Sequence, residues 1–306
     1  MPPSGCQICG CADVRSCFRS ARGPVWRCLE CGVHFVVNAV AHPDQAALFY
    51  ATIDEERYVE YFEPFRKGQY RHVVGALKLP AGATHLDVGA SYGWMVEVGQ
   101  ELGLDSHGIE PGEAAPTAEA VRPRIRRASL EDFAAGEGRR FDLITLWHVL
   151  EHLPEPRRAL ELLRGLLADG GRLLIAVPNA EGRLYRAGLL LQRTLRRPEL
   201  MNELWYFHNP NMHFYYYTPR SLAELVRRSG LALCEQSVIE AFDWRTIYSR
   251  VLLPLPRLLL RTVGPLLARS RFTGRENLIT VAGPVGRAGC DSDQIGWGTE
   301  VSDRRK

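Results

Sequence analysis

The sequence predicts an α/β protein with a parallel, doubly wound sheet and a small metal-binding module near its N-terminus. From Thr84 onward, short apolar runs alternate with amphipathic segments, which is typical of a sheet with helices on both faces. The first of these runs ends in an acid and passes through a glycine-containing turn, at 85–94. Six of the eight cysteines lie within the first 31 residues. These three observations set the expected architecture.

Length and composition are those of an ordinary globular protein. The chain has 306 residues, of which 46% are hydrophobic and 24% are charged. A formal net charge of +3 is nearly neutral for this length and gives no reason to expect a nucleic-acid partner. We find no signal-peptide pattern and no uncharged apolar run near the roughly 20 residues of a spanning helix. We therefore expect a cytoplasmic protein.

The cysteines predict a zinc ribbon within residues 1–38. They form two CxxC pairs, each followed by glycine, at Cys6, Cys9, Cys28 and Cys31. Two such turns present four thiolates to a tetrahedral Zn²⁺, and a closed four-cysteine site is structural. The alternative is a set of disulfides or free thiols, and Cys11 or Cys17 offers a substitute ligand. Ribbon strands are expected at 26–28 and 33–37.

Residues 39–80 predict a helical linker or lid. Asp44 caps a first helix through 50, and a second helix runs from 55 to 79 with Pro64 interrupting it. Its aromatic residues either line the mouth of a binding site or pack the linker onto the core. They are Tyr58, Tyr61, Phe62 and Phe65.

A domain is expected at 81–283, with its elements in the following order. Strands are predicted at 85–89, 106–111, 124–128, 141–147, 172–177, 231–239 and 277–282. Helices are predicted at 94–102 and at 156–168, and residues 169–171 are expected to end the second of them. A third helix is predicted to begin at Thr218–Pro219. Residues 284–306 lack periodicity and predict a disordered tail.

The glycine turn predicts a nucleotide-like ligand at the carboxyl ends of the strands. Glycines at 89 and 93 let the backbone turn tightly and approach that ligand. Glu110 lies about twenty residues further on, where a carboxylate accepts the hydroxyls of a ribose. No GxGxxG is present, which argues against a dehydrogenase.

At this point the sequence resembles the class I S-adenosylmethionine-dependent methyltransferases. Five segments carry the resemblance in the family's order: 87–93, 108–111, 147–153, 167–179 and 213–222. It implies a Rossmann-like seven-stranded sheet with helices on both faces and an antiparallel seventh strand. It also implies S-adenosylmethionine as the methyl donor.

The resemblance further implies which residues surround the cofactor. Asp87, Gly89, Ala90, Ser91 and Gly93 would enclose its amino-acid end, and Glu110 would hold the ribose. Leu130 and Glu131 would border the adenine, and Trp147 and His148 would border the methionine sulfur. One departure is Ser91, which stands where the family pattern has its middle glycine.

The implied reaction is methyl transfer to oxygen or carbon of a small-molecule or glycan acceptor. His213, with Tyr216 close by, matches the base of sugar-nucleotide C-methyltransferases, which also carry an N-terminal zinc module. His152 belongs to a Glu–His pair that resembles quinone O-methyltransferases, and His208 is a third candidate base. The alternative for each is a structural histidine.

Two insertions, at about 182–212 and 244–275, bear on the acceptor. The first contains Arg183, Arg186, Arg193, Arg196 and Arg197 among leucines without an acid at 182–198, and 244–275 is also free of acids. Such segments bind an anionic membrane surface that presents a lipid-linked acceptor, or they form a soluble lid. The acceptor is then small, sugar-nucleotide-borne or lipid-linked. The alternatives are a membrane-associated prenyl-quinone-type O-methyltransferase and a non-catalytic zinc-ribbon scaffold.

Overall fold

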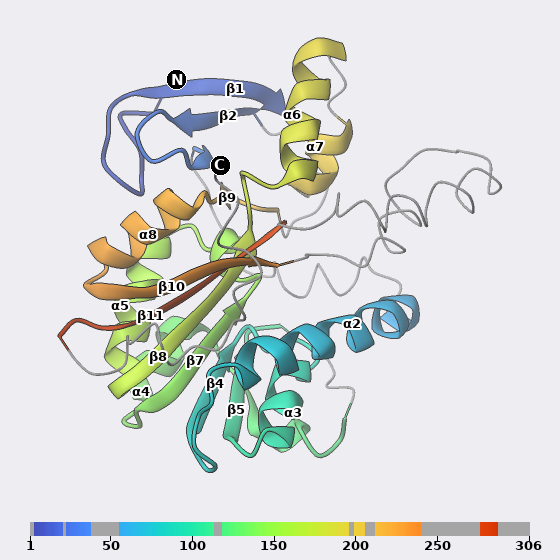
Figure 1. Ribbon diagram of the computed structural model, residues 1–306, viewed down its shortest axis with the longest axis vertical. Helices are drawn as coiled ribbons and strands as arrows, with labels where there is room; N and C mark the ends of the chain where they lie inside the picture. The colour runs from blue at the N-terminus through green and yellow to red at the C-terminus, as the bar shows by residue number, and fades with distance from the viewer. Residues whose placement is uncertain are drawn as a thin grey trace, which may run out of the picture.

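The fold is built on one seven-stranded sheet, shown in a computed structural model that describes residues 3–20, 23–37, 55–112, 118–195, 199–205, 212–239 and 276–286 (Figure 1). The strand order is β10-β11-β8-β7-β4-β5-β6. Their bounds are β4 Thr84–Val88, β5 Asp105–Glu110, β6 Ile125–Arg127, β7 Phe141–Trp147, β8 Leu167–Pro178, β10 Leu231–Ile239 and β11 Asn277–Pro284. Neighbours from β6 to β8 are parallel, whereas β11 is antiparallel to β8 and β10. The predicted fold class is confirmed.

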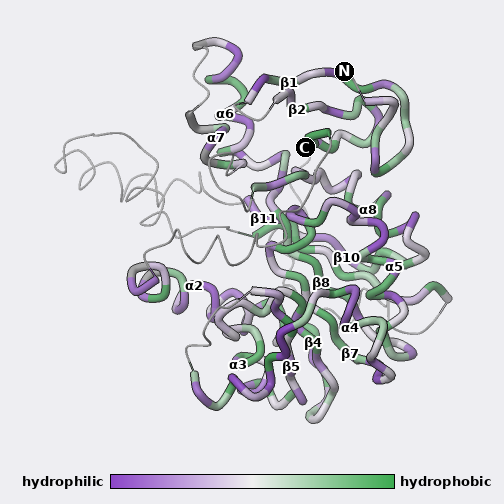
Figure 2. Tube along the Cα trace, turned by 180° about the vertical axis from the view of Figure 1, so that it is seen from behind, coloured by the Kyte–Doolittle hydropathy of each residue, from purple (hydrophilic) through white to green (hydrophobic). Residues whose placement is uncertain are grey.

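Helices cover both faces of this sheet. On one face lie α2 (Glu55–Gly75) and α3 (Trp94–Glu101), and on the other lie α4 (Leu130–Gly136), α5 (Pro156–Leu166) and α8 (Pro219–Arg228) (Figure 1). Figure 2 shows apolar residues running along the central strands. The near-continuous apolar run of β7 is buried on both sides, as expected of a strand between two helical layers.

Parallel pairing brings four strand ends to one edge of the sheet. β4 ends at Val88, β5 at Glu110, β6 at Arg127 and β7 at Trp147. A 3-10 turn, η2 (Leu150–His152), follows β7 at the same edge. In open α/β sheets ligands bind outside this carboxyl edge. This edge is therefore the expected location of a ligand site.

A second, four-stranded sheet contains the N-terminal module. Its order is β1 (Val14–Ser20), β2 (Gly23–Cys28), β3 (His34–Val36) and β9 (Tyr215–Tyr216), all antiparallel. The sequence predicted parts of β2 and β3 but neither β1 nor β9. Because β9 comes from the large domain, residues of the predicted 1–38 module complete their sheet with a strand about 180 residues further along the chain.

Helices α6 (Arg183–Leu195) and α7 (Glu199–Leu204) lie beside the small sheet (Figures 1 and 2). His34 Nδ1 lies 2.6 Å from the Tyr185 hydroxyl of α6. Phe18 of β1 meets the ring of Trp205 edge-on at 6.2 Å. The first insertion therefore packs against the N-terminal module.

Two sequence predictions about element boundaries are wrong. Helix α2 continues through Pro64. Proline costs a helix interior about 3 kcal/mol, and aromatic packing of this helix offsets that cost. Tyr58 stacks on Phe62 at 4.6 Å and Trp94 at 6.0 Å. These contacts favour the packing role over the lining role for Tyr58 and Phe62.

The second correction concerns residues 169–171, which lie inside β8 instead of ending a helix. Strand β8 begins at Leu167, where α5 has already ended. Gly170 has a φ of 79°, and a Cβ on Gly171 would lie 2.6 Å from the Phe141 carbonyl oxygen. The glycines therefore form an irregular strand start pressed against β7.

Some predictions fall outside the described residues: the helix at 44–50, His208, the second insertion at 244–275 and the tail beyond 286. Strand β11 itself extends two residues further than expected, to Pro284. Within the described part of the chain, no helix is both long enough and apolar enough to cross a membrane.

Thr218 joins the two sheets, and its loss is expected to destabilise the fold. Its hydroxyl group accepts a hydrogen bond from the Ser221 N–H in a capping box, and the same O–H donates to the Cys31 carbonyl at 2.7 Å. Thr218→Val should lower the free energy of unfolding by about 2 kcal/mol, from a lost N-cap and a lost buried hydrogen bond. Urea unfolding measures this. Thr194→Val, on the exposed side of α6, is the control, and equal losses in both variants would contradict the role of Thr218.

Candidate active site

Asp87 is the buried acid at the end of β4. It is 3% exposed, and the Thr145 hydroxyl of β7 donates to it at 2.5 Å. Thr145 Oγ1 also lies 3.0 Å from His85 Nε2, so this nitrogen carries the proton when the threonine proton points to Asp87. Burial raises the pKa of Asp87 to about 7, and the nearby Glu110 charge adds to the rise. The site therefore has an acid poised at neutral pH.

The predicted turn at 89–93 connects β4 to α3. Gly89 and Gly93 have φ angles of 75° and 79°, in the left-handed region that favours glycine. A Cβ on Gly89 would lie 2.5 Å from Val149 Cγ2, so a side chain there would have to displace Val149. Ser91 has a φ of 48°, which explains why the family pattern has glycine at this position. Ala90 lies in the same turn and is buried.

Glu110, at the end of β5, holds this turn from the side. Its two carboxylate oxygens accept the Ser91 N–H at 3.0 Å and the Gly112 N–H at 2.8 Å. Burial raises its pKa, and the two backbone N–H groups act against that rise. A carboxylate has about four lone-pair positions, so two remain for further hydrogen-bond donors.

The remaining residues predicted to contact the cofactor lie near this edge of the sheet and differ in their exposure to solvent. Trp147 ends β7, is buried, and meets the ring of Tyr70 edge-on at 4.8 Å. Leu130 begins α4 and packs into the core, whereas the adjacent Glu131 is exposed. The structure thus brings Asp87, the turn, Glu110 and Trp147 to one edge, with Leu130 and Glu131 at the helix after β6.

His148 follows Trp147 in a conformation unusual for its residue type. Its φ is 56°, a left-handed value that strains a non-glycine residue. Its Nδ1 lies 2.9 Å from Oε1 of Glu151, whose side chain is fully buried. Burial lowers the pKa of His148 well below its usual range and raises that of Glu151 to about 7.

The predicted base candidates lie together beyond His148. The rings of His152 and His213 are 4.7 Å apart, and Tyr216 lies 5.4 Å from His213. Burial lowers the pKa of both histidines, so their rings are neutral at pH 7. The Tyr216 hydroxyl donates to the Leu204 carbonyl at 2.8 Å, which gives this residue a structural contact. We call Glu151, His152 and His213 the His–Glu cluster.

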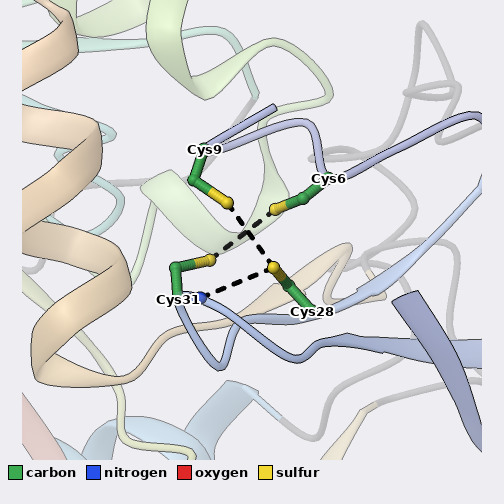
Figure 3. A group of neighbouring side chains, drawn as sticks. All are labelled: Cys6, Cys9, Cys28 and Cys31. Carbon is green, nitrogen blue, oxygen red and sulfur yellow. Dashed lines mark hydrogen bonds between the residues drawn. The ribbon is translucent and has the colours of Figure 1, made fainter. Parts of the chain in front are cut away.

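The four predicted cysteines converge at the edge of the small sheet (Figure 3). Their sulfurs all lie within 4.8 Å of one another, with 3.6 Å between Cys6 and Cys31 and 3.5 Å between Cys9 and Cys28. A tetrahedral Zn²⁺ with bonds of about 2.3 Å holds sulfurs about 3.8 Å apart. The donor set therefore fits zinc. Cys11 and Cys17 are not part of this group.

Sequence reasoning missed two residues that the geometry singles out. The sequence pattern marks Glu151 only as the neighbour of His152, although its spacing of three from His148 places both on one turn. Thr145 is a polar residue within an apolar strand, two positions before its end. That pattern was its only signal, since its contact with Asp87 comes from a neighbouring strand.

Comparison with known proteins decides the family. A family model described as "Methyltransferase domain" matches residues 62–236, more than half of the chain. The chain belongs to this methyltransferase family. The match spans α2 to β10 and so includes every cofactor residue predicted above. The prediction of an S-adenosylmethionine-dependent methyltransferase is confirmed, and the alternative of a non-catalytic scaffold loses its basis.

Curated relatives of the methyltransferase carry one recurring name. The chain is 29% identical over 181 residues to a ubiquinone biosynthesis O-methyltransferase of Xanthomonas axonopodis pv. citri, covering 56% of this chain and 72% of the relative. It is 24% identical over 202 residues to a protein of the same name from Acinetobacter baumannii, covering 63% and 80%.

One solved structure reaches a TM-score of 0.50 and shows the same fold. A chain from the complex of a methyltransferase activator with a putative methyltransferase of Haloferax volcanii matches with a TM-score of 0.50 at 16% identity, covering 79% of this chain and 98% of that one. A methyltransferase from Archaeoglobus fulgidus gives a TM-score of 0.47 at 15% identity, covering 74% and 98%.

Proposed function

We propose that this methyltransferase binds S-adenosylmethionine across the carboxyl ends of β4 and β5. Asp87 would pair with the cofactor's ammonium group above the 89–93 turn, and the remaining lone pairs of Glu110 would accept the ribose hydroxyls. Trp147 and His148 would border the sulfonium, and Leu130 and Glu131 the adenine. The sulfonium supplies a reactive methyl group, so the protein's task is to align an acceptor with it.

The raised pKa of Asp87 predicts a pH-dependent affinity for the cofactor. The carboxyl must be ionised to pair with an ammonium group, so protons compete with the cofactor below pH 7. S-adenosylhomocysteine should therefore bind about tenfold more weakly near pH 6 than near pH 8. Calorimetry at both pH values measures this. Asp87→Asn should remove the difference in affinity between the two pH values. An equal affinity of the wild-type chain at both pH values would contradict the pairing of Asp87 with the ammonium group.

We propose a hydroxyl oxygen as the methyl acceptor. The supporting observation is the His–Glu cluster beside His148, since a hydroxyl loses a proton on methylation and needs a group to take it. The rings of His213 and His152 meet edge-on there, with Glu151 beside them. The relatives' name, which specifies O-methyl transfer, supports oxygen over carbon.

The acceptor proposal is tested by formation of S-adenosylhomocysteine from S-adenosylmethionine. Catechol, the simplest aromatic diol, is the hydroxyl probe, and acetylacetone is the carbon-acid probe. Methylated catechol is the expected product, and methylation of acetylacetone alone would contradict the choice of oxygen. His213→Gln should reduce kcat and leave the affinity for S-adenosylhomocysteine unchanged, because His213 lies beyond the cofactor residues.

We also propose that the four cysteines bind one structural zinc ion and that the N-terminal module is a zinc ribbon. The fit of the donor set to a tetrahedron supports this. The glycine after each pair, Gly10 and Gly32, adopts a φ of 76° and 80°, which relaxes each knuckle. Zinc analysis of the purified chain should find one equivalent bound by the cysteines.

An acceptor presented by a membrane is the second candidate, favoured by the surface of α6. Leu190 is 62% exposed and Leu191 is 38% exposed, and Arg186 and Arg193 are exposed on the same helix. Leucines and arginines of this kind bind anionic lipid surfaces. Co-sedimentation with phosphatidylglycerol vesicles at low salt should pellet the chain and should be weakened by Leu190→Glu. A chain that stays in the supernatant would instead support the soluble lid.

A further inference from the structure

The His–Glu cluster brings together ligand atoms of a kind that binds transition metals. Glu151, His152 and His213 each offer one atom, and these atoms lie within 4.8 Å of one another. Glu151 and His152 come from η2, whereas His213 precedes β9. Phe214 N–H donates to the Glu151 carbonyl at 2.7 Å and so fixes the two segments side by side.

Each member of the cluster is oriented by a further hydrogen bond. His152 Nδ1 donates to the Met212 carbonyl at 3.1 Å, which directs its Nε2 the other way. His213 is hydrogen-bonded to the Leu204 backbone, and Glu151 Oε1 is paired with His148 Nδ1 at 2.9 Å. Metal-ligating histidines characteristically donate their second nitrogen to a carbonyl or carboxylate, and ligating carboxylates are themselves hydrogen-bonded. The cluster has both features.

The second carboxylate oxygen of Glu151 is a further feature that indicates a cation site. Oε2 is buried and has no hydrogen-bond partner among the described residues. A buried carboxylate oxygen without a partner is costly, and a bound cation would compensate it.

We propose that Glu151, His152 and His213 bind a second divalent ion, distinct from zinc at the cysteines. Two imidazoles and one carboxylate select a first-row transition metal such as Mn²⁺, Fe²⁺ or Zn²⁺ over Mg²⁺ or Ca²⁺, which take oxygen ligands. Bonds of about 2.1 Å would draw the three atoms to about 3 Å apart, a shift that small side-chain rotations supply.

Three protein ligands leave coordination positions open for the acceptor. A metal there would lower the pKa of an acceptor hydroxyl bound to it, and the hydroxyl proton would pass to water before the oxygen takes the methyl group. The two histidines would then act as metal ligands instead of as free bases. This role rests on the proposed function, whereas metal binding itself does not.

Manganese titration of the zinc-loaded, full-length chain tests the site. Mn²⁺ prefers carboxylate and imidazole to thiolate, so it will not replace zinc at the cysteines. Loss of the electron paramagnetic resonance signal of free Mn²⁺ should show one ion bound per chain. Glu151→Gln and His213→Gln should each weaken this binding at least tenfold. His107→Gln, which removes an imidazole elsewhere on the sheet, should bind as the wild type does.

Two results would overturn the proposal. One is a wild-type chain that holds a single zinc ion and takes up neither Mn²⁺ nor a second zinc. The other is Mn²⁺ binding that Glu151→Gln and His213→Gln leave unchanged, with circular dichroism showing both variants folded. Neither measurement uses acceptor or methyl donor. A chain that binds Mn²⁺ but methylates no hydroxyl would therefore refute the acceptor proposal and leave the metal site standing.

Discussion

Loss of the zinc ion proposed at the four-cysteine cluster is expected to reduce methyl transfer about 100-fold while leaving cofactor binding intact. A structural zinc site contributes about 10–16 kcal/mol, so its loss should unfold β1, β2 and β3. Strand β9 would then lose its pairing partner, because His34 pairs with Tyr216 and Phe35 with Tyr215. His213 directly precedes these residues, and a displacement of about 1 Å at a catalytic group reduces kcat about 100-fold.

The experiment compares Cys31→Ser with Cys17→Ser. The first variant removes a thiol from the cluster, whereas the second removes one of the cysteines outside it. Cys31→Ser should lose its zinc and about 100-fold in kcat while keeping its affinity for S-adenosylhomocysteine, since β4 and β5 belong to the other sheet. Cys17→Ser should keep both its zinc and its kcat. Full activity in a zinc-free chain would show that β9 needs no support from the module.

Glu110→Gln is expected to cause the largest loss of cofactor affinity. The amide retains one carbonyl oxygen and replaces the other by an NH₂ group, which cannot accept the Ser91 or Gly112 N–H. Residue 110 would lose one of its two hydrogen bonds from backbone N–H groups, and the ribose would lose a charged acceptor. Together these effects should weaken S-adenosylhomocysteine binding about 100-fold, or about 3 kcal/mol.

The matched control for Glu110→Gln is Asp105→Asn at the opposite end of β5. Asp105 pairs with Arg124 on the surface and lies at the start of the strand, away from the carboxyl edge. Calorimetric titration of both variants with S-adenosylhomocysteine should show weak binding only for Glu110→Gln. A similar loss in both would mean that charge on β5, and not the position of Glu110, determines affinity.

The local sequence pattern predicted most of the large sheet, because its strands are buried runs of apolar residues that are flanked by turn residues. β7 and β10 match their predicted ranges, and α8 begins at the predicted Thr218 cap. The same local reasoning placed 169–171 at a helix end, because an Asp-Gly-Gly sequence is typical of both a helix end and a strand irregularity. Only the proximity of Gly171 to β7 distinguishes these cases.

The features that the sequence did not predict, β9 and the His–Glu cluster, depend on contacts between segments that are distant in the sequence. β9 has two residues, too few for any periodicity, and exists because β3 pairs with it. The His–Glu cluster likewise joins η2 to residues about 60 positions later. The sequence could name its histidines through resemblance, but it could not show that Glu151 lies between them and His148.

A crystal structure of the full chain with S-adenosylhomocysteine tests the central claim most directly. The ribose hydroxyls should donate to the Glu110 carboxylate, and the amino-acid end should lie over the 89–93 turn beside Asp87. The sulfur should then face Trp147, His148 and the His–Glu cluster. A ligand bound without contact to Glu110 or the turn would contradict the assignment of this edge as the methyl-donor site.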